Sequence, residues 1–175
     1  MNLRDTFMSL SENELLNAYA QKYGLKIGAK TVVAGTNIEE MVESVKRLNA
    51  KGLSATIDNL GEFVFEEDKA IEAKNNILTV IEAIEREQLD AHISLKLSQL
   101  GLDIDIDFAY DNLREIVERA SESDIFINID METYDRLQIS FDMLEELLKN
   151  FDNVGTVIQA YFFRAKDDIE KFKDF

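Results

Sequence analysis

Residues 92–101 read His-Ile-Ser-Leu-Lys-Leu-Ser-Gln-Leu-Gly, and this stretch points to the fold of the whole chain. Successive side chains of a β-strand alternate between two faces, so its apolar residues share one face and its polar residues the other. Lys96 lies on the polar face. If both faces of the strand are covered, this lysine projects into an enclosed polar centre, where it is costly to desolvate unless it is paired or used. The stretch therefore predicts a strand that carries Lys96 into an interior site.

Strand-like and helix-like segments alternate five times along the chain. The predicted strands cover residues 32–34, 54–58, 92–101, 125–130 and 154–161. Apolar stripes at helical spacing follow them, over residues 38–48, 66–86, 113–120, 140–148 and 166–173. We also predict a capping box of Thr36 with Glu39, and a leading helix that starts at Ser11 and ends near Gly24. The predicted organisation is an N-terminal helical lead-in over residues 1–31 and a repeating β/α region over residues 32–175.

Strict alternation of strands and helices is typical of an α/β fold with a parallel sheet and right-handed crossovers. Two architectures fit, the doubly wound open sheet and the (β/α)₈ TIM barrel. Strands of a doubly wound sheet are covered on both faces and read as continuous apolar runs. Here the strands alternate instead: residues 125–130 read Ile-Phe-Ile-Asn-Ile-Asp, with three isoleucines on one face. The pattern favours the barrel, and no strand is followed by the glycine-rich turn of a dinucleotide-binding fold.

A complete barrel has eight units and about 250 residues, whereas this chain of 175 residues supplies five units. We therefore expect it to be the first part of a longer barrel protein, ending just after a fifth helix. The open strand edges are expected to make the isolated piece prone to self-association.

The composition restricts the partners and the kind of site. A net charge of −16 disfavours nucleic acid, because phosphate binding needs clustered lysine and arginine. No apolar run approaches the roughly 20 residues of a membrane span, and the start of the chain does not read as a signal peptide, so we expect a cytoplasmic protein. With no cysteine and one histidine, no metal site is expected. The acidic residues 103–107 lack the pattern of a calcium loop, and we expect a solvated loop in which Asp107 caps a helix.

Parallel barrels place their active sites at the carboxyl ends of the strands. The inward residues near these ends are Asp58, Glu62, Lys96, Ser98, Asp130, Gln159 and Tyr161. Lys96 could form a purely structural ion pair with Asp130, and His92, at the start of its strand, is expected to be structural. Two reaction classes fit a functional Lys96. A desolvated lysine with a depressed pKa can form a Schiff base, as in aldolase-type barrels, whereas a charged lysine can orient a carboxylate substrate beside a cofactor.

Five motifs, one at each predicted strand, together resemble proline dehydrogenase, most closely its short monofunctional form in Gram-positive bacteria. They are Val33-Ala34-Gly35-Thr36, Asp58-Asn59-Leu60-Gly61-Glu62, Ser94-Leu95-Lys96-Leu97-Ser98-Gln99-Leu100-Gly101, Asn128-Ile129-Asp130-Met131-Glu132 and Val157-Ile158-Gln159-Ala160-Tyr161. Any one of these motifs is weak alone, but five in order cover nearly the whole chain.

The resemblance implies a distorted (β/α)₈ barrel that binds FAD and oxidises L-proline to Δ1-pyrroline-5-carboxylate. Hydride passes to the flavin, and the flavin passes electrons to a membrane quinone. Such a protein would be cytoplasmic and peripheral to the inner face of the membrane. By the same resemblance, Lys96 contacts the substrate, Asp130 is a catalytic residue, Met131 and Gln159 contact the flavin, and Glu62 shapes the site.

The resemblance also implies what this chain lacks. The family's sixth strand, which grips the cofactor, is absent, as is the late helix whose paired arginines clamp the proline carboxylate. We therefore expect these 175 residues alone neither to hold FAD tightly nor to oxidise proline, with the C-terminal barrel half as the missing partner. Two other hypotheses stay open at this point: a lysine Schiff-base aldolase-type barrel, and a non-catalytic barrel fragment whose rim residues are only structural.

Overall fold

The computed structural model describes residues 35–61 and 63–173. The chain divides into two compact units, Met1–Ser44 and Val45–Phe175. The predicted leading helix, the predicted strand at residues 32–34 and the predicted boundary at residues 31 and 32 lie outside the described residues, as does Glu62. The division into a lead-in and a barrel region therefore stays a prediction.

In the first unit, the described residues form the beginning of helix α3 (Ile38–Asn49), which continues into the second unit. Asn37 caps this helix, because its Oδ1 accepts a hydrogen bond from the backbone N of Glu40 at 2.9 Å. Glu40 Oε2 in turn accepts hydrogen bonds from the backbone N and the Oγ1 of Thr36, at 2.8 and 3.1 Å. The predicted capping box of Thr36 with Glu39 is wrong by one residue, since Asn37 is at least as good an N-cap as Thr36.

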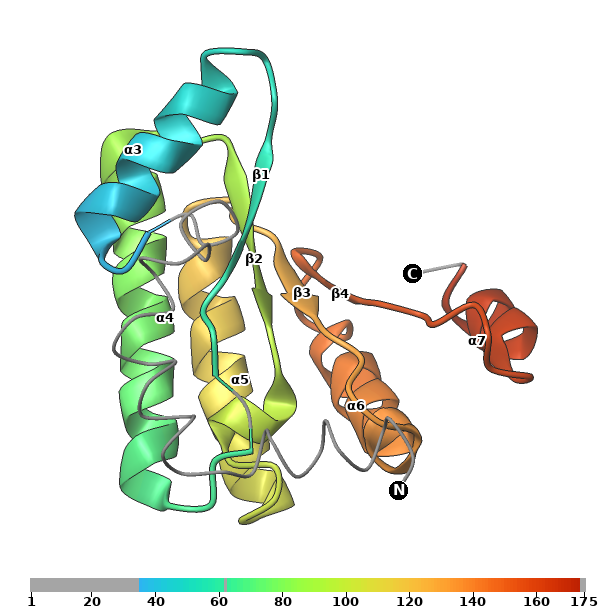
Figure 1. Ribbon diagram of the computed structural model, residues 1–175. Coiled ribbons are helices and arrows are strands. Elements are labelled where there is room, and N and C mark those ends of the chain that lie inside the picture. The colour runs from blue at the N-terminus through green and yellow to red at the C-terminus, as the bar shows by residue number, and fades with distance from the viewer. Residues whose placement is uncertain (1–34, 62, 174–175) are drawn as a thin grey trace, which may run out of the picture. The chain divides into compact units, whose positions relative to one another are not determined.

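Four short parallel strands form the sheet of the second unit, in the order β1-β2-β3-β4. The strands are β1 (Ala55–Asp58), β2 (Ala91–Leu95), β3 (Ile127–Ile129) and β4 (Val154–Thr156). The helices are α4 (Glu67–Glu87), α5 (Ile106–Ser121), α6 (Tyr134–Leu147) and α7 (Ala165–Phe172). Each strand is followed by a helix, as Figure 1 shows, and the predicted parallel α/β fold is confirmed.

The core lies between the strands and the helices that connect them. Ile93 and Leu95 of β2 are at most 1% exposed, and Ile127 and Ile129 of β3 are fully buried. The helices contribute the predicted stripes, and their buried members are Ile77, Val80, Ile81, Ile84, Leu113, Ile116, Val117 and Ala120. Helices α4 and α5 lie side by side along the sheet (Figure 1). Because burial of each large aliphatic side chain contributes about 1.5–3 kcal/mol, this layer fixes the strands and therefore their polar ends.

The predicted third strand ends earlier than expected. β2 stops at Leu95, and a 3₁₀ helix, η2 (Leu97–Leu100), follows it. The backbone N of Leu102 donates to the carbonyl of Leu97 at 3.1 Å, and Gly101 adopts a left-handed φ of 98° that favours glycine. Leu97 and Leu100 are both fully buried in this turn, an arrangement that a continued strand could not provide. Ser98 therefore does not lie on the polar face of a strand.

Other boundaries also differ from the prediction, including β3, which is shorter than the predicted 125–130. Helix α6 begins at Tyr134 rather than Ser140, and β4 ends at Thr156, so Gln159 and Tyr161 follow the strand instead of belonging to it. The N-cap of α5 is Asp105 rather than Asp107, since the Asp105 side chain accepts from the backbone N of Phe108 at 2.8 Å. Asp105 can take this role because it directly precedes the first turn in an extended conformation.

Two features bear on association and location. In the described sheet, β4 pairs with β3 alone, so its other edge is open, and self-association of the chain stays a prediction. Among the described residues, no helix combines the length and the apolar character needed to span a membrane.

Candidate active site

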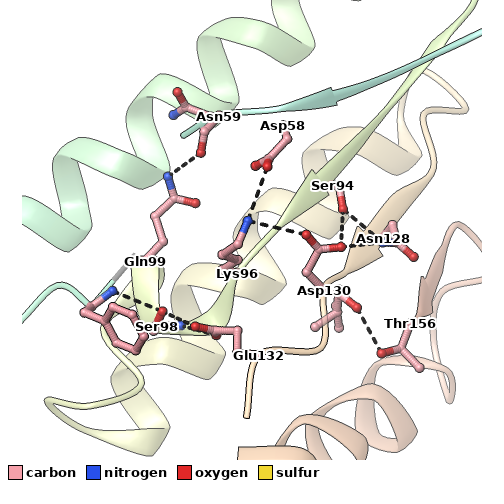
Figure 2. Close-up of polar contacts among 12 residues, drawn as sticks. Asp58, Asn59, Ser94, Lys96, Ser98, Gln99, Asn128, Asp130, Glu132 and Thr156 are labelled. Atoms are coloured by element: carbon pink, nitrogen blue, oxygen red, sulfur yellow. Dashed lines mark hydrogen bonds and ion pairs between the residues drawn. The ribbon is translucent and has the colours of Figure 1, made fainter. Parts of the chain in front are cut away.

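Lys96 stands directly after β2 and contacts two aspartates from the neighbouring strand ends. Its Nζ lies 3.2 Å from Oδ2 of Asp58, the last residue of β1, and 3.5 Å from Oδ2 of Asp130, which follows β3. Figure 2 shows the ammonium group between the two carboxylates. The expected contact of Lys96 with Asp130 is present, and Asp58 is the closer partner. The carboxyl ends of three parallel strands thus converge on one charged centre.

Asp130 is held in place from the side opposite Lys96. Its Oδ1 accepts hydrogen bonds from Ser94 Oγ at 2.6 Å and from Asn128 Nδ2 at 3.0 Å. Asn128 Nδ2 also donates to Ser94 Oγ at 2.9 Å, and the backbone N of Asp130 donates to the carbonyl of Leu95 at 2.8 Å. One carboxylate oxygen is therefore fixed by the sheet, and the other faces the lysine.

The sheet register explains this network. Asp58, Ser94 and Asn128 are partners in adjacent strands, so their side chains emerge in one row across the sheet. Lys96 and Asp130 lie two residues further along their chains, on the same face and nearer the carboxyl ends. The sequence alone does not indicate that Ser94 and Asn128 hold Asp130. Strand alternation placed both on the polar face, but only the register shows that they are neighbours.

The electrostatic balance at Lys96 favours the charged lysine. Partial burial alone lowers the pKa of Lys96, but the hydrogen bond and charge of Asp58, followed by the charge and hydrogen bond of Asp130, outweigh burial. The net result is a raised pKa for Lys96. A Schiff-base lysine needs the opposite shift, toward a neutral amine. The site therefore favours a cation that orients an anionic group over a nucleophilic amine.

The other predicted site residues have mixed outcomes. Met131 is half-buried and directly follows Asp130, so the chain brings it to the same strand end. Gln159 is half-buried in the segment after β4, and its Oε1 is shielded from solvent with no hydrogen-bond partner among the described residues. Tyr161 is 76% exposed. Ser98 instead contacts Glu132. Glu62 lies outside the described residues, and the roles assigned to all these residues stay predictions.

Of two segments expected to be structural, one agrees with the expectation and the other differs in part. The ring of His92 shares a hydrogen bond with Thr56 Oγ1 at 2.8 Å, toward the amino ends of the strands. The acidic loop is less solvated than expected, because Asp103 binds the guanidinium of Arg136 through both carboxylate oxygens. Within residues 35–61 and 63–173, no group of three or more histidine, cysteine, aspartate or glutamate side chains could hold a metal ion.

A parallel β/α sheet with a lysine–carboxylate centre at its carboxyl edge defines this protein as an α/β protein whose site lies at the carboxyl ends of the strands. The family profile described as proline dehydrogenase matches residues 41–175. The chain belongs to the proline dehydrogenase family.

Individual relatives agree with this assignment. The chain is 42% identical over 172 residues to Proline dehydrogenase 1 of Bacillus subtilis subsp. natto, covering 98% of this chain and 57% of that protein. It is 32% identical over 151 residues to Proline dehydrogenase of Deinococcus radiodurans, covering 83% of this chain and 49% of that protein. The chain thus spans about half the length of these relatives.

Solved structures support the fold. Proline utilization A of Bdellovibrio bacteriovorus, inactivated by N-propargylglycine, superposes with a TM-score of 0.78 at 22% identity, covering 91% of this chain and 20% of that one. A mutant of Bradyrhizobium japonicum proline utilization A gives 0.64 at 27% identity, over 78% of this chain and 16% of that one. The predicted barrel-type fold is confirmed, and the proline dehydrogenase assignment is favoured over the aldolase-type and non-catalytic alternatives.

Proposed function

We propose that the protein containing this chain is an FAD-dependent proline dehydrogenase, which oxidises L-proline to Δ1-pyrroline-5-carboxylate and passes the electrons to a quinone. The observation that supports this proposal is the position of Lys96. It is paired with Asp58 and Asp130 at the carboxyl edge of the sheet, in a chain of the proline dehydrogenase family. Relatives that the chain matches over most of its own length are named for this activity.

The residues at this edge fit the proposed substrate. L-proline carries a carboxylate and a secondary amine, and a lysine with a raised pKa offers the carboxylate a positive charge at neutral pH. Asp130 accepts hydrogen bonds from Ser94 and Asn128 and pairs with Lys96, and we assign its carboxylate charge to the neighbourhood of the amine. That charge bears on the rate, because the amine must be neutral to lose a hydride readily.

The residues also fit a flavin. The isoalloxazine ring presents both a ring N–H and carbonyl oxygens, so it can use the two ends of an amide side chain. Gln159 has an orphaned, shielded Oε1 that can accept such an N–H, and we assign Gln159 and Met131 to hold the ring. When bound, FAD supplies the redox chemistry by accepting a hydride from the amino acid. Glu62 is assigned to the wall of the same site.

The remaining proposals concern the whole protein. Since the chain covers 57% of the length of its Bacillus subtilis relative, the further length is proposed to complete the barrel and the FAD site. The 175 residues alone are then expected neither to bind FAD tightly nor to oxidise L-proline. A cytoplasmic protein that meets its quinone at the inner face of the membrane is the proposed location.

The test is product formation by the purified gene product, supplied with FAD, L-proline and a soluble quinone. We expect mass spectrometry to detect a product two hydrogens lighter than proline. We also expect quinone reduction that depends on L-proline. An FAD-bound protein that gives no such product would contradict the proposal. Borohydride trapping of Lys96 with a carbonyl compound would instead revive the Schiff-base alternative.

A further inference from the structure

Glu132 makes two hydrogen bonds to a single buried residue of the neighbouring loop. It lies two residues after Asp130, and its Oε1 accepts from the backbone N of Ser98 at 3.0 Å. Its Oε2 accepts a short hydrogen bond from Ser98 Oγ. Ser98 is fully buried, and Figure 2 shows the carboxylate meeting both of its donors. Hydrogen bonds to a carboxylate are roughly twice as strong as neutral ones, so this pair ties the loop after β3 firmly to η2.

Ser98 in turn holds the loop after β1. Its Oγ accepts from the backbone N of Phe63 at 3.2 Å, and its carbonyl accepts from the backbone N of Val64 at 3.1 Å. Phe63 has a left-handed φ of 56°, which is rare for a bulky residue and persists only where neighbours hold it. The contacts of Ser98 with Phe63 and Val64 are thus the means of holding this strained segment.

Gln99 adds a contact to the same loop. Its Nε2 donates to the carbonyl of Asn59 at 3.0 Å, and the side chain is nearly fully buried. A Cβ atom added to Gly61 would lie 3.0 Å from this Nε2, so the loop backbone passes close to Gln99. The helix η2 therefore contacts the loop after β1 on both sides of position 62.

The same turn begins at Lys96. The backbone N of Gln99 donates to the carbonyl of Lys96 at 3.2 Å, so any displacement of η2 moves the backbone that carries the lysine. The loops after β1, β2 and β3 thus meet at Ser98, and Glu132 is the charged group that joins the third of them to the other two. None of these contacts belongs to the apolar core under the sheet.

We propose that Glu132 is a positioning residue, which acts through Ser98 to hold both Lys96 and the loop after β1 at the rim of the site. The part of this proposal that concerns catalysis rests on the proposed function. Glu132 touches neither substrate nor cofactor in this role, and its effect is to keep the three loops in one arrangement around the charged centre.

The hydrogen bonds that run from Glu132 through Ser98 to Phe63 and Val64 form a clamp, which is tested by amide-resolved hydrogen exchange of the purified protein. This measurement requires no activity. In Glu132→Ala, exchange at Phe63 and Val64 is expected to rise about tenfold, while exchange in α4 and α5 stays unchanged. Ser98→Ala is expected to speed exchange at Phe63 much more than at Val64, because the carbonyl that Val64 uses remains. Unchanged exchange rates at both amides in folded Glu132→Ala would overturn the clamp. If that variant does not fold, the deciding variant is Ser98→Ala, and an equal increase in exchange at Phe63 and Val64 would overturn the clamp.

The catalytic part is tested by proline-dependent flavin reduction in the gene product. Glu132→Ala is expected to raise the KM for L-proline about tenfold, and Glu132→Gln, which keeps one acceptor, to recover part of the loss. The matched control is Glu118→Gln, a substitution on the exposed face of α5. A normal KM in Glu132→Ala overturns the positioning role. If no variant and no wild-type protein oxidises proline, the proposed function fails, and hydrogen exchange still decides the clamp.

Discussion

Lys96 Nζ lies closer to Asp58 Oδ2 than to Asp130 Oδ2, at 3.2 Å against 3.5 Å. Asp58 is the last residue of β1, and the register places it beside Ser94 on β2, two residues before the lysine. The lysine therefore bridges two strand ends rather than closing a single ion pair. This arrangement explains why the pKa of Lys96 is raised even though its side chain is only 21% exposed.

The raised pKa of Lys96 predicts how stability depends on pH. A group whose folded pKa exceeds its unfolded value of 10.5 contributes its full stabilisation below that value and loses it as pH rises through the folded pKa. The stability difference between wild type and Lys96→Met is thus expected to be constant near neutral pH and to shift in favour of the variant above about pH 10.5. Urea unfolding at several pH values measures this difference.

Asp58→Asn is the companion variant, because Asp58 is the larger source of the raised pKa. The difference in stability between Asp58→Asn and Asp58→Asn/Lys96→Met is expected to change less with pH than the difference between wild type and Lys96→Met. If the difference in stability between wild type and Lys96→Met does not change with pH, Lys96 is not held as a charged, paired group. The exposed variant Lys51→Met serves as the control for unfolding at alkaline pH.

The hydroxyl of Ser94 is predicted to matter for activity because it fixes Asp130. Ser94→Ala removes the 2.6 Å hydrogen bond to Asp130 Oδ1 and is expected to cost about 1–3 kcal/mol of stability and to slow flavin reduction several-fold. Ser54→Ala is a matched control, since Ser54 Oγ makes a 2.7 Å hydrogen bond to Asp90 away from the charged centre. Stopped-flow measurement of flavin reduction in both variants separates the loss of the Asp130 contact from the general loss of a serine hydrogen bond. Equal rates in the two variants would speak against a role for Ser94 at the site.

Two glycines with left-handed backbones are predicted to differ in how they tolerate a methyl group. At Gly101, with φ 98°, an added Cβ would lie 2.7 Å from the Phe108 ring, whereas at Gly52, with φ 74°, it would meet nothing within 4 Å. Gly52→Ala is therefore expected to cost about 1 kcal/mol, from the backbone alone. Gly101→Ala adds a clash in a buried turn and is expected to cost roughly 1–3 kcal/mol more. Urea unfolding curves give both values, and equal costs would contradict the observed packing of Phe108 on Gly101.

The sequence pattern predicts the parts of this structure that follow from periodicity. Alternation in residues 92–97 correctly places Ile93 and Leu95 in the core and Lys96 on the polar face, because strand side chains must alternate. Convergence of strand ends predicts the contact of Lys96 with Asp130, because parallel strands bring their carboxyl ends together.

Other features depend on contacts between distant segments and have no local signal. The predicted strand includes residues 97–100, yet they form η2: Gln99 and Leu100 break the alternation, and burial of Leu100 and the left-handed Gly101 favour a turn. The support of Asp130 by Asn128 and Ser94 requires the register between two strands. The hydrogen bonds of Glu132 to Ser98 join two loops that are 34 residues apart, and neither loop alone indicates them.

The proposed role of Lys96 as the charged partner of L-proline beside the flavin is tested most directly by flavin reduction after anaerobic mixing of the FAD-loaded gene product with L-proline. Wild type is expected to lose its oxidised flavin absorbance rapidly. Lys96→Met, which removes the charge and keeps much of the side-chain volume, is expected to lose about 2–4 kcal/mol of transition-state stabilisation, or roughly 30- to 1,000-fold in kcat/KM. Wild-type rates in a folded, FAD-bound Lys96→Met protein would contradict the account.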